Sequence, residues 1–464
     1  MHYSPGAPIL QSYDLISWEY ISHAVPTLNW GSKYNLVGGQ AYVKGIYAST
    51  LRYRQSNGLW YWIGCIEYST TYVFTAPSVT GPWTQTASIS TCYYDAGLLI
   101  DDDDTMYVAY GNTNINVAQL SSNGLSQVKT QQVFASTVGS IEGSRMYKVN
   151  GKYYIFNTLP ASAEYVLQAS SPFGPYTQKL LESNVGTPVS GAGIPHQGGI
   201  VDTPSGQWYY MAFIDNYPGG RTPVLAPITW GSDGFPVLTT SNGAWPKSEA
   251  YPLSQHNLTN PLGTDSFSGT SLSAQWEWNH NPDTTKFTVN NGLTLRTATV
   301  TSDLYKARNT LTHRIYGPKS RGTIALTISS MASGDRAGLA MLRDSSAYVA
   351  VVNNGGTFRV SQVSGLTMDS TWNTVSTGSE VAGVNLPGGT TKVWFRATAD
   401  ISPTGKTASF QYSTDGTTFS NIGNSYSLNT TWEFFMGYRY GIFNYATSAL
   451  GGSVTVSSFD MEAA

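Results

Sequence analysis

The chain has 464 residues, a formal net charge of −3 and only 11% charged residues. Proteins that bind nucleic acid or anionic membranes usually present a basic face, so this balance argues against both partners. The 31 Tyr, 13 Trp and 47 Gly are typical of an all-β protein with many turns. They also suit sugar binding, because the flat faces of sugar rings stack on aromatic side chains.

Neither a membrane span nor a leader is visible in the sequence. No run of 18 apolar residues occurs, and the opening Met1-His2-Tyr3-Ser4-Pro5-Gly6 lacks the basic and apolar regions of a signal peptide. The low charge still favours an extracellular protein. Cys65 and Cys92 permit one disulfide, and two buried free thiols are the equal alternative.

A repeated unit of about four strands runs through residues 1–254. Its innermost strands are expected to start near Tyr47, Asp95, Glu142 and His196, at spacings of 48, 47 and 54 residues. This is the length of a propeller blade, and the first strand of each blade lies nearest the axis. The sequence therefore predicts that these four residues meet at one central mouth.

The first repeat is incomplete. Outer-strand turns beginning near residues 12, 76, 120, 169 and 230 predict five blades, but no two inner strands precede the first turn. Residues 1–22 are expected to form only the outer half of blade one, with about 20 to 30 residues missing by comparison with the other blades. A longer natural protein that carries those strands and a signal peptide would explain both absences.

Asp95 and Glu142 occupy equivalent positions in neighbouring blades. One interpretation is structural, with both charges satisfied by Arg52, Arg145 or Arg221. The other is hydrolysis of a glycosidic bond, in which one carboxylic acid protonates the leaving oxygen and a second carboxylate, about 6.5 to 9.5 Å away in inverting enzymes, activates water. Glu142 is then the candidate acid and Asp95 its neighbour.

These segments resemble glycoside hydrolase family 43 across essentially the whole chain. Glu142-Gly-Ser-Arg-Met-Tyr147 is similar to the family's acid segment. Tyr94-Asp-Ala-Gly-Leu-Leu-Ile100 is similar to the segment whose first Asp orients the acid and modulates the acid's pKa. Gly45-Ile-Tyr-Ala-Ser-Thr-Leu-Arg52 matches a blade-two strand, with Tyr47 where Trp is usual. The resemblance implies that Tyr47 and Arg52 bind substrate.

Two further strands complete the resemblance. His196-Gln-Gly-Gly-Ile-Val-Asp202 is similar to the strand whose His lies on the axis and holds water or a calcium ion, and Gly220-Arg221 begins a strand whose Arg reaches the sugar and the acid. These matches imply that His196 and Arg221 bind substrate and that His196 is a candidate metal site. No cofactor is required, although a structural calcium is conceivable. Asp101–Asp104 are expected to form a solvated turn, since calcium-loop spacing is absent.

The resemblance also shows what is missing. The family's catalytic base is an Asp on the first strand of blade one, which this chain lacks, and Asp14 falls in the outer repeat segment. The base is therefore expected to be absent from the chain, and the chain as given to be poorly stable and essentially inactive.

Residues 265–464 carry no blade motif and follow a linker at 255–264. The segments at 276–283 and 334–339 resemble the concanavalin-like β-sandwich found in one branch of the family, in which Trp276 and Trp278 are expected in the core. The predicted protein is a monomeric, inverting arabinofuranosidase acting on arabinoxylan side chains. A β-xylosidase is the alternative within the family, and a non-catalytic carbohydrate-binding propeller is the alternative outside it.

Overall fold

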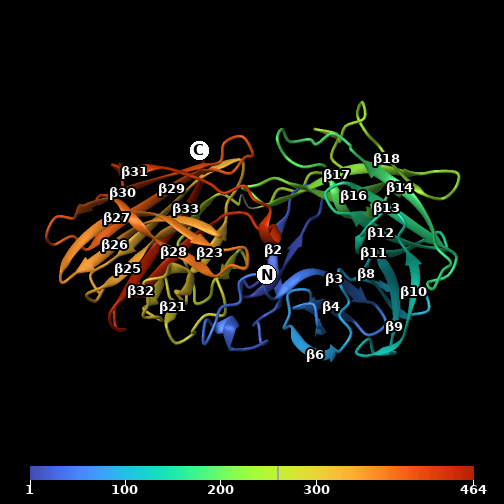
Figure 1. The fold of residues 1–464 in the computed structure, drawn as a ribbon, viewed down its shortest axis with the longest axis horizontal. Helices are drawn as coiled ribbons and strands as arrows, with labels where there is room; N and C mark the ends of the chain where they lie inside the picture. The colour runs from blue at the N-terminus through green and yellow to red at the C-terminus, as the bar shows by residue number, and fades with distance from the viewer. Residues whose placement is uncertain (259–260) are drawn as a thin grey trace.

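The computed structural model describes residues 1–258 and 261–464 as two all-β bodies (Figure 1). The N-terminal body has a propeller arrangement, coloured blue to green, and the C-terminal body is a β-sandwich, coloured yellow to red. Three short 3-10 helices, η1 (Ser32–Asn35), η2 (Leu304–Lys306) and η3 (Glu433–Phe435), interrupt the strands. Within the described residues, no helix is long and apolar enough to cross a membrane.

Four blades are antiparallel sheets of four strands in chain order. The first comprises β3 (Ile46–Arg54), β4 (Leu59–Ile66), β5 (Thr70–Ala76) and β6 (Thr84–Ile89). The second comprises β7 (Gly97–Ile100), β8 (Met106–Asn112), β9 (Asn114–Leu120) and β10 (Gln127–Ala135). The third comprises β11 (Glu142–Val149), β12 (Lys152–Leu159), β13 (Ala163–Ala169) and β14 (Thr177–Ser183). The fourth comprises β15 (His196–Asp202), β16 (Trp208–Asp215), β17 (Arg221–Trp230) and β18 (Pro236–Leu238). The strands read from the repeats are thus confirmed for these four blades.

The N-terminal residues form a separate two-stranded sheet, β1 (Gly6–Gln11) paired with β2 (Glu19–Val25). Its apolar side chains pack against the β3–β6 blade in one cluster that includes Ile9, Val25, Trp62 and Phe74. Residues 1–22 were expected to supply two strands at this position, and the structure has two strands there. A complete fifth blade is not seen.

Consecutive blades are held together by apolar clusters, and the turn at Asp101–Asp104 adds charged contacts. The Asp101 carboxylate accepts hydrogen bonds from Lys148 Nζ and Tyr153 Oη of the next blade, both at 2.5 Å. Asp104 pairs with Arg54 of the preceding blade. The expectation of a merely solvated turn was therefore wrong, because three of its four carboxylates, those of Asp101, Asp102 and Asp104, pair with basic side chains of neighbouring blades.

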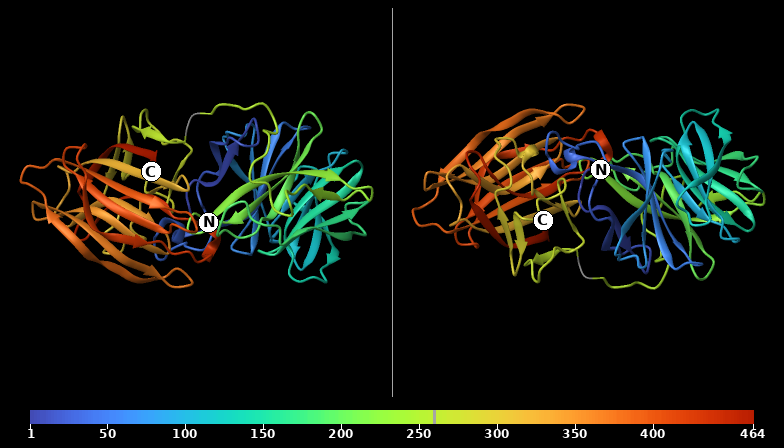
Figure 2. Two further views of the ribbon diagram at one scale, coloured as in Figure 1. Left: turned by 90° about the horizontal axis from the view of Figure 1, so that it is seen from above. Right: turned by 90° about the horizontal axis from the view of Figure 1, so that it is seen from below.

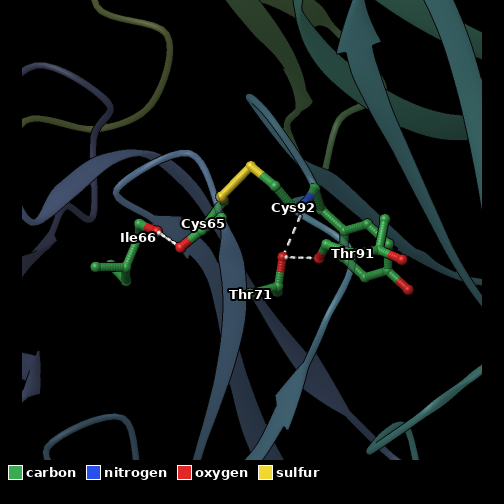
Figure 3. The surroundings of a disulfide bond; sticks show 7 residues. Cys65, Ile66, Thr71, Thr91 and Cys92 are labelled. Carbon is green, nitrogen blue, oxygen red and sulfur yellow. Dashed lines mark hydrogen bonds between the residues drawn. A yellow bond between two sulfur atoms is a disulfide. The ribbon is translucent and has the colours of Figure 1, made fainter. Parts of the chain in front are cut away.

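A disulfide links Cys65 in β4 to Cys92, which follows β6 (Figure 3). Thr71 lies beside it, where its hydroxyl donates to Thr91 O and accepts from Tyr93 N, each at 2.8 Å. Of the two states left open by the sequence, the structure has the bridged one. The bond ties β4 to the segment that leads to Asp95.

The sandwich consists of two antiparallel sheets. The eight-stranded sheet contains β19 (Gly263–Asp265), β21 (Phe287–Val289), β22 (Leu293–Arg296), β24 (Lys319–Thr327), β29 (Lys392–Asp400), β30 (Thr407–Ser413), β31 (Ser420–Ser427) and β33 (Ser453–Ala463). The seven-stranded sheet contains β20 (Trp276–Trp278), β23 (Leu311–Arg314), β25 (Asp335–Leu342), β26 (Ser345–Asn354), β27 (Thr357–Met368), β28 (Thr374–Asn385) and β32 (Arg439–Ala446). Trp276 and Trp278 are buried in the core, as predicted.

The two bodies dock through residues 279–281, with the N terminus at their junction (Figure 2). Asn279 donates to Tyr42 Oη at 2.7 Å, and His280 Nε2 accepts from Ala41 N at 2.9 Å. Asn281 bonds both backbone groups of Leu28, at 2.9 and 3.0 Å. Because these side chains are buried, each polar group needs its partner on the other body, and this requirement fixes the register of docking.

Candidate active site

Two carboxylates of neighbouring blades meet at the inner ends of the strands. Glu142 begins β11, and Asp95 lies two residues before β7 with a left-handed backbone (φ 51°). The Glu142 Oε2 atom accepts hydrogen bonds from Tyr94 Oη at 2.9 Å and from Asn112 Nδ2 at 2.8 Å. These two donors orient the carboxylate, and sequence reasoning missed them both, although Tyr94 adjoins Asp95.

Asp95 is 8% exposed, and Gln197 Nε2 donates to its Oδ2 atom at 3.5 Å. Burial, and next the charge of Glu142, raise the pKa of Asp95 to about 6. Asp95 therefore holds a proton more readily than an exposed aspartate does. Such a pair can supply the acid that glycosidic cleavage needs.

The inner strands of these two blades approach very closely. A β-carbon on Gly97 would lie 2.1 Å from Ser144 O and 2.7 Å from Met146 N, so only glycine fits between β7 and β11. This contact brings the start of β11, and Glu142 with it, toward Asp95. The short-range sequence signal for the site is thus a glycine shortly after each carboxylate, Gly97 two residues after Asp95 and Gly143 directly after Glu142.

Aromatic rings flank the carboxylates. Tyr47 stacks on Tyr68 with ring centroids 5.3 Å apart, and Tyr68 lies 6.0 Å from Tyr94. Tyr68 is 61% exposed, and burial together with the charges of Asp95 and Glu142 raises its pKa. These rings offer a flat surface on which a sugar can stack. The sequence identified Tyr47 but not Tyr68, which lies in a turn rather than on an inner strand.

His196 and Arg221 lie on the other side of Asp95. His196 is 1% exposed; its Nδ1 lies 3.0 Å from Ile194 O, and its Nε2 lies 3.9 Å from Asp215 Oδ2. Burial lowers the pKa of His196, so the ring is neutral near pH 7. Arg221 Nε pairs with Asp215 Oδ1 at 3.3 Å, and the charge of Arg221 lowers the pKa of Asp95.

The guanidinium of Arg221 lies between two phenyl rings. It is 4.1 Å from the ring centre of Phe213 and 4.0 Å from that of Phe435, which belongs to the sandwich. The backbone of Gly437 packs so closely on Gly219 that a β-carbon there would lie 2.0 Å from Gly219 O. The sandwich therefore contributes one residue to this site, a contribution that no local sequence pattern could indicate.

Arg52 is not part of this group. It lies six residues beyond the start of β3, about 20 Å along an extended strand. There its Nη1 donates to Leu51 O, and its guanidinium lies 5.6 Å from the ring centre of Tyr147. Arg52 therefore lies apart from the residues around Glu142, and its contact with substrate stays a prediction.

The structural interpretation of the carboxylates also lacks support. Among the residues that the structure describes, no ion pair within 4.0 Å joins Asp95 or Glu142 to a basic side chain. Arg145 instead donates to Ala96 O at 2.6 Å and acts on Asp95 only through its charge. Neither carboxylate is thus held in a direct ion pair, and the functional interpretation stays a prediction.

The surroundings of His196 do not suit calcium. That ion takes six to eight oxygen ligands, whereas His196 faces a single carboxylate that Arg221 already neutralises. In the described part of the chain, no group of three or more His, Cys, Asp or Glu side chains could hold a metal ion. The residues present therefore do not fit the metal site that the resemblance suggested.

Asp14 is occupied structurally. It is fully buried, and its carboxylate accepts from the backbone of Ile16, Ser17 and His256. Those hydrogen bonds outweigh burial and hold its pKa well below the usual range. A fully buried carboxylate held by backbone donors is shielded from the water that a base must activate.

Comparison with known proteins agrees with this geometry. Residues 1–236 match the model of glycosyl hydrolases family 43, and residues 264–462 match the beta-xylosidase C-terminal concanavalin A-like domain. A beta-xylosidase of Formosa agariphila is 27% identical over 384 residues, which cover 68% of this chain and 64% of that protein. A non-reducing end alpha-L-arabinofuranosidase of Bacteroides ovatus is 27% identical, covering 60% and 56%. The chain thus spans less than two thirds of the curated relatives it matches.

One solved structure is much more similar. It is 48% identical, with a TM-score of 0.97, and the match covers 100% of this chain and 94% of that one. It comes from work in which engineering the active site of a family 43 glycoside hydrolase generated an enzyme with both endo-xylanase and exo-arabinofuranosidase activity. A bifunctional protein of Bacteroides eggerthii is 31% identical, with a TM-score of 0.88, covering 100% of this chain and 60% of that protein.

Proposed function

We propose that this chain, which belongs to glycosyl hydrolases family 43, is built to release arabinofuranose from the side chains of arabinoxylan with inversion at the anomeric carbon. The observation that carries the proposal is the pair Asp95 and Glu142, unpaired by any described basic group and flanked by stacked tyrosines. The 48% identical structure, whose description names exo-arabinofuranosidase activity, favours arabinose as the released sugar.

In the proposed reaction, Glu142 donates its proton to the leaving oxygen as the glycosidic carbon–oxygen bond breaks. Tyr94 and Asn112 hold that carboxyl group in place. Asp95 orients the acid from the neighbouring blade, and the Tyr47–Tyr68 stack supports the sugar ring. A water molecule attacks the opposite face of the anomeric carbon and gives its proton to a base.

We further propose that neither Asp14 nor Asp215 serves as that base. Asp14 is saturated by three backbone donors, and Asp215 is paired with Arg221. General-base assistance commonly raises a rate about 10² to 10⁴-fold. The 464-residue chain should therefore hydrolyse its substrate more slowly, by this factor, than an enzyme that has the base. This reasoning also supports the alternative of a carbohydrate-binding propeller without catalysis.

The β1–β2 sheet is, in this proposal, the outer half of a fifth blade. It packs on the β3–β6 blade through a shared apolar cluster, just as each complete blade packs on the next. We also propose an extracellular location, which the Cys65–Cys92 disulfide supports, since such bonds persist in oxidising compartments. A β-xylosidase remains the second candidate, because curated relatives carry that name.

The decisive experiment incubates the purified chain with arabinoxylan and with xylo-oligosaccharides and quantifies arabinose and xylose. Arabinose should exceed xylose, at a low rate that added formate, a small carboxylate able to accept the proton of water, should raise. Glu142→Gln is the control and should remove the release. Xylose as the main product would favour the β-xylosidase, whereas sugar binding without release even with formate would favour the binding propeller.

A further inference from the structure

A hollow of about 300 Å³ lies on the outer face of the seven-stranded sheet, away from the sandwich core. Strand alternation separates the two faces. Ala337 and Leu339 of β25 point into the core, whereas Arg336 lines the hollow. Part of this outer face is covered by the segment around Leu304 and Tyr305. The hollow is the part that this segment and the propeller leave open.

The register of the strands explains why the face is hollow there. Val352 of β26 pairs with both Arg336 and Arg359, which places the two arginines in one row across three strands. In the next row, the paired residues all have small side chains: Gly338, Ala350, Ser361 and Gly383. The row beyond contains Tyr348, Val363 and Glu380. Small residues therefore form a trough between two rows of large ones.

The two arginines extend across this trough but find different partners. Arg359 forks onto Glu380, with Nη2 at 2.6 Å from Oε1, and the Ser361 hydroxyl adds a further bond to Glu380 at 2.5 Å. Arg336 donates to the Tyr348 hydroxyl at 3.4 Å and also interacts with the Tyr445 side chain. Among the described residues, no carboxylate lies within 4.0 Å of Arg336, and its buried Nε has no hydrogen-bond partner. The hollow thus holds two guanidinium groups and one carboxylate.

We propose that this hollow binds the carboxylate of a uronic acid residue in a polysaccharide. A guanidinium with unused donors in a recess favours a planar carboxylate, to which it can donate two parallel hydrogen bonds. Besides the apolar Val352 and Val363, the lining contains uncharged polar side chains that suit ring hydroxyls: Ser302, Asn354, Thr377 and Ser379. A hollow of this volume is at the small end of ligand pockets and fits one or two sugar rings.

This site is separate from the propeller, so the proposal does not depend on the hydrolytic one. It gives the sandwich a function of its own, which is to hold an acidic polysaccharide. Glucuronate and galacturonate present the same carboxylate but differ in the orientation of one ring hydroxyl. The side chains of the hollow indicate a uronic acid as the class of ligand. A direct comparison of glucuronate with galacturonate then shows which of the two sugars it binds.

Calorimetric titration of the full chain at low salt tests the proposal, with glucuronate, galacturonate, glucose and acetate as separate ligands. Glucuronate or galacturonate should bind, with glucose and acetate each at least about tenfold weaker, since a charge-assisted hydrogen bond and the ring hydroxyls both contribute. Arg336→Gln should weaken uronate binding by about tenfold or more. The matched control is Arg321→Gln, which removes an exposed arginine paired with Glu462 on the other sheet and should leave binding unchanged.

A second variant guards against misfolding of the first. Ser379→Trp fills the hollow from the exposed strand β28, leaves the ion pair in place and should also abolish binding. Both variants are compared with the wild type by thermal unfolding. Uronate affinity unchanged in either folded variant would overturn the proposal, as would glucose binding as tightly as the uronates. Acetate binding as tightly as the uronates would overturn the assignment to a sugar.

Discussion

Replacement of Glu182 by Gln should change how stability depends on pH. Glu182 lies in β14 directly opposite Glu164 of β13; it is 3% exposed, and neither of its carboxylate oxygens has a partner among the described residues. Burial raises the pKa of Glu182 from 4.5 to about 8. Between these two pH values the folded protein binds a proton that the unfolded chain releases, so the free energy of unfolding must fall as the pH rises.

The size of this effect follows from the shift. Each pKa unit corresponds to about 1.36 kcal/mol, so a rise from 4.5 to about 8 amounts to roughly 5 kcal/mol across that interval. Glu182→Gln carries no such proton and should match the wild type near pH 4.5 but become progressively more stable than it toward pH 8. The assay is urea unfolding of the propeller at pH 5, 6, 7 and 8, with Glu249→Gln, an exposed site, as control. Parallel stability curves for the wild type and Glu182→Gln would refute the reasoning.

Three further predictions concern the acid, the disulfide and the domain junction. Glu142→Gln, assayed with formate present, should slow the cleavage of substrates with alkoxide leaving groups by about 10² to 10⁴-fold and of activated aryl substrates much less; equal losses would exclude Glu142 as the acid. Cys65→Ser with Cys92→Ser should cost about 3 kcal/mol of stability, and thiol titration of the unfolded, unreduced wild type should find no reactive thiol. Glu277→Ala leaves Arg439, which it pairs at 2.6 Å, buried without a carboxylate and should cost about 3 to 5 kcal/mol in urea unfolding; a loss below about 1 kcal/mol would contradict a buried pair.

The repeat pattern predicted the blades well because each blade is local. A four-stranded antiparallel sheet is formed by consecutive segments joined by short turns, so its signals recur in order along the chain. The same locality predicted Asp95 and Glu142, since equivalent positions in successive blades must converge on the axis. Arg52 belongs to the same strand motif as Tyr47 but lies nearer the other end of β3, beside Tyr147, so its contact with substrate stays a prediction.

What the sequence did not indicate depends on contacts between distant segments. The sequence around Asp101 indicates only a turn. Its partners Lys148 and Tyr153 lie on the next blade, about 50 residues further along the chain, so the local sequence does not reveal them. Asn112 lies at the end of β8 and contacts Glu142 only once two blades are side by side. Such pairs have no fixed spacing, so neither periodicity nor local propensity can identify them.

The contact between Phe435 and Arg221 joins the sandwich to the candidate active site of the propeller. Residue 435 reaches the propeller because the backbone at Gly437 fits against Gly219 without room for a side chain, and Tyr438 N donates to Pro218 O at 3.1 Å. The junction is further fixed by the buried polar contacts of residues 279–281. Phe435 covers one side of the Arg221 guanidinium and belongs to the sandwich. The propeller without the sandwich would therefore lack this contact. The sandwich therefore contributes to the candidate active site as well as forming a body of its own.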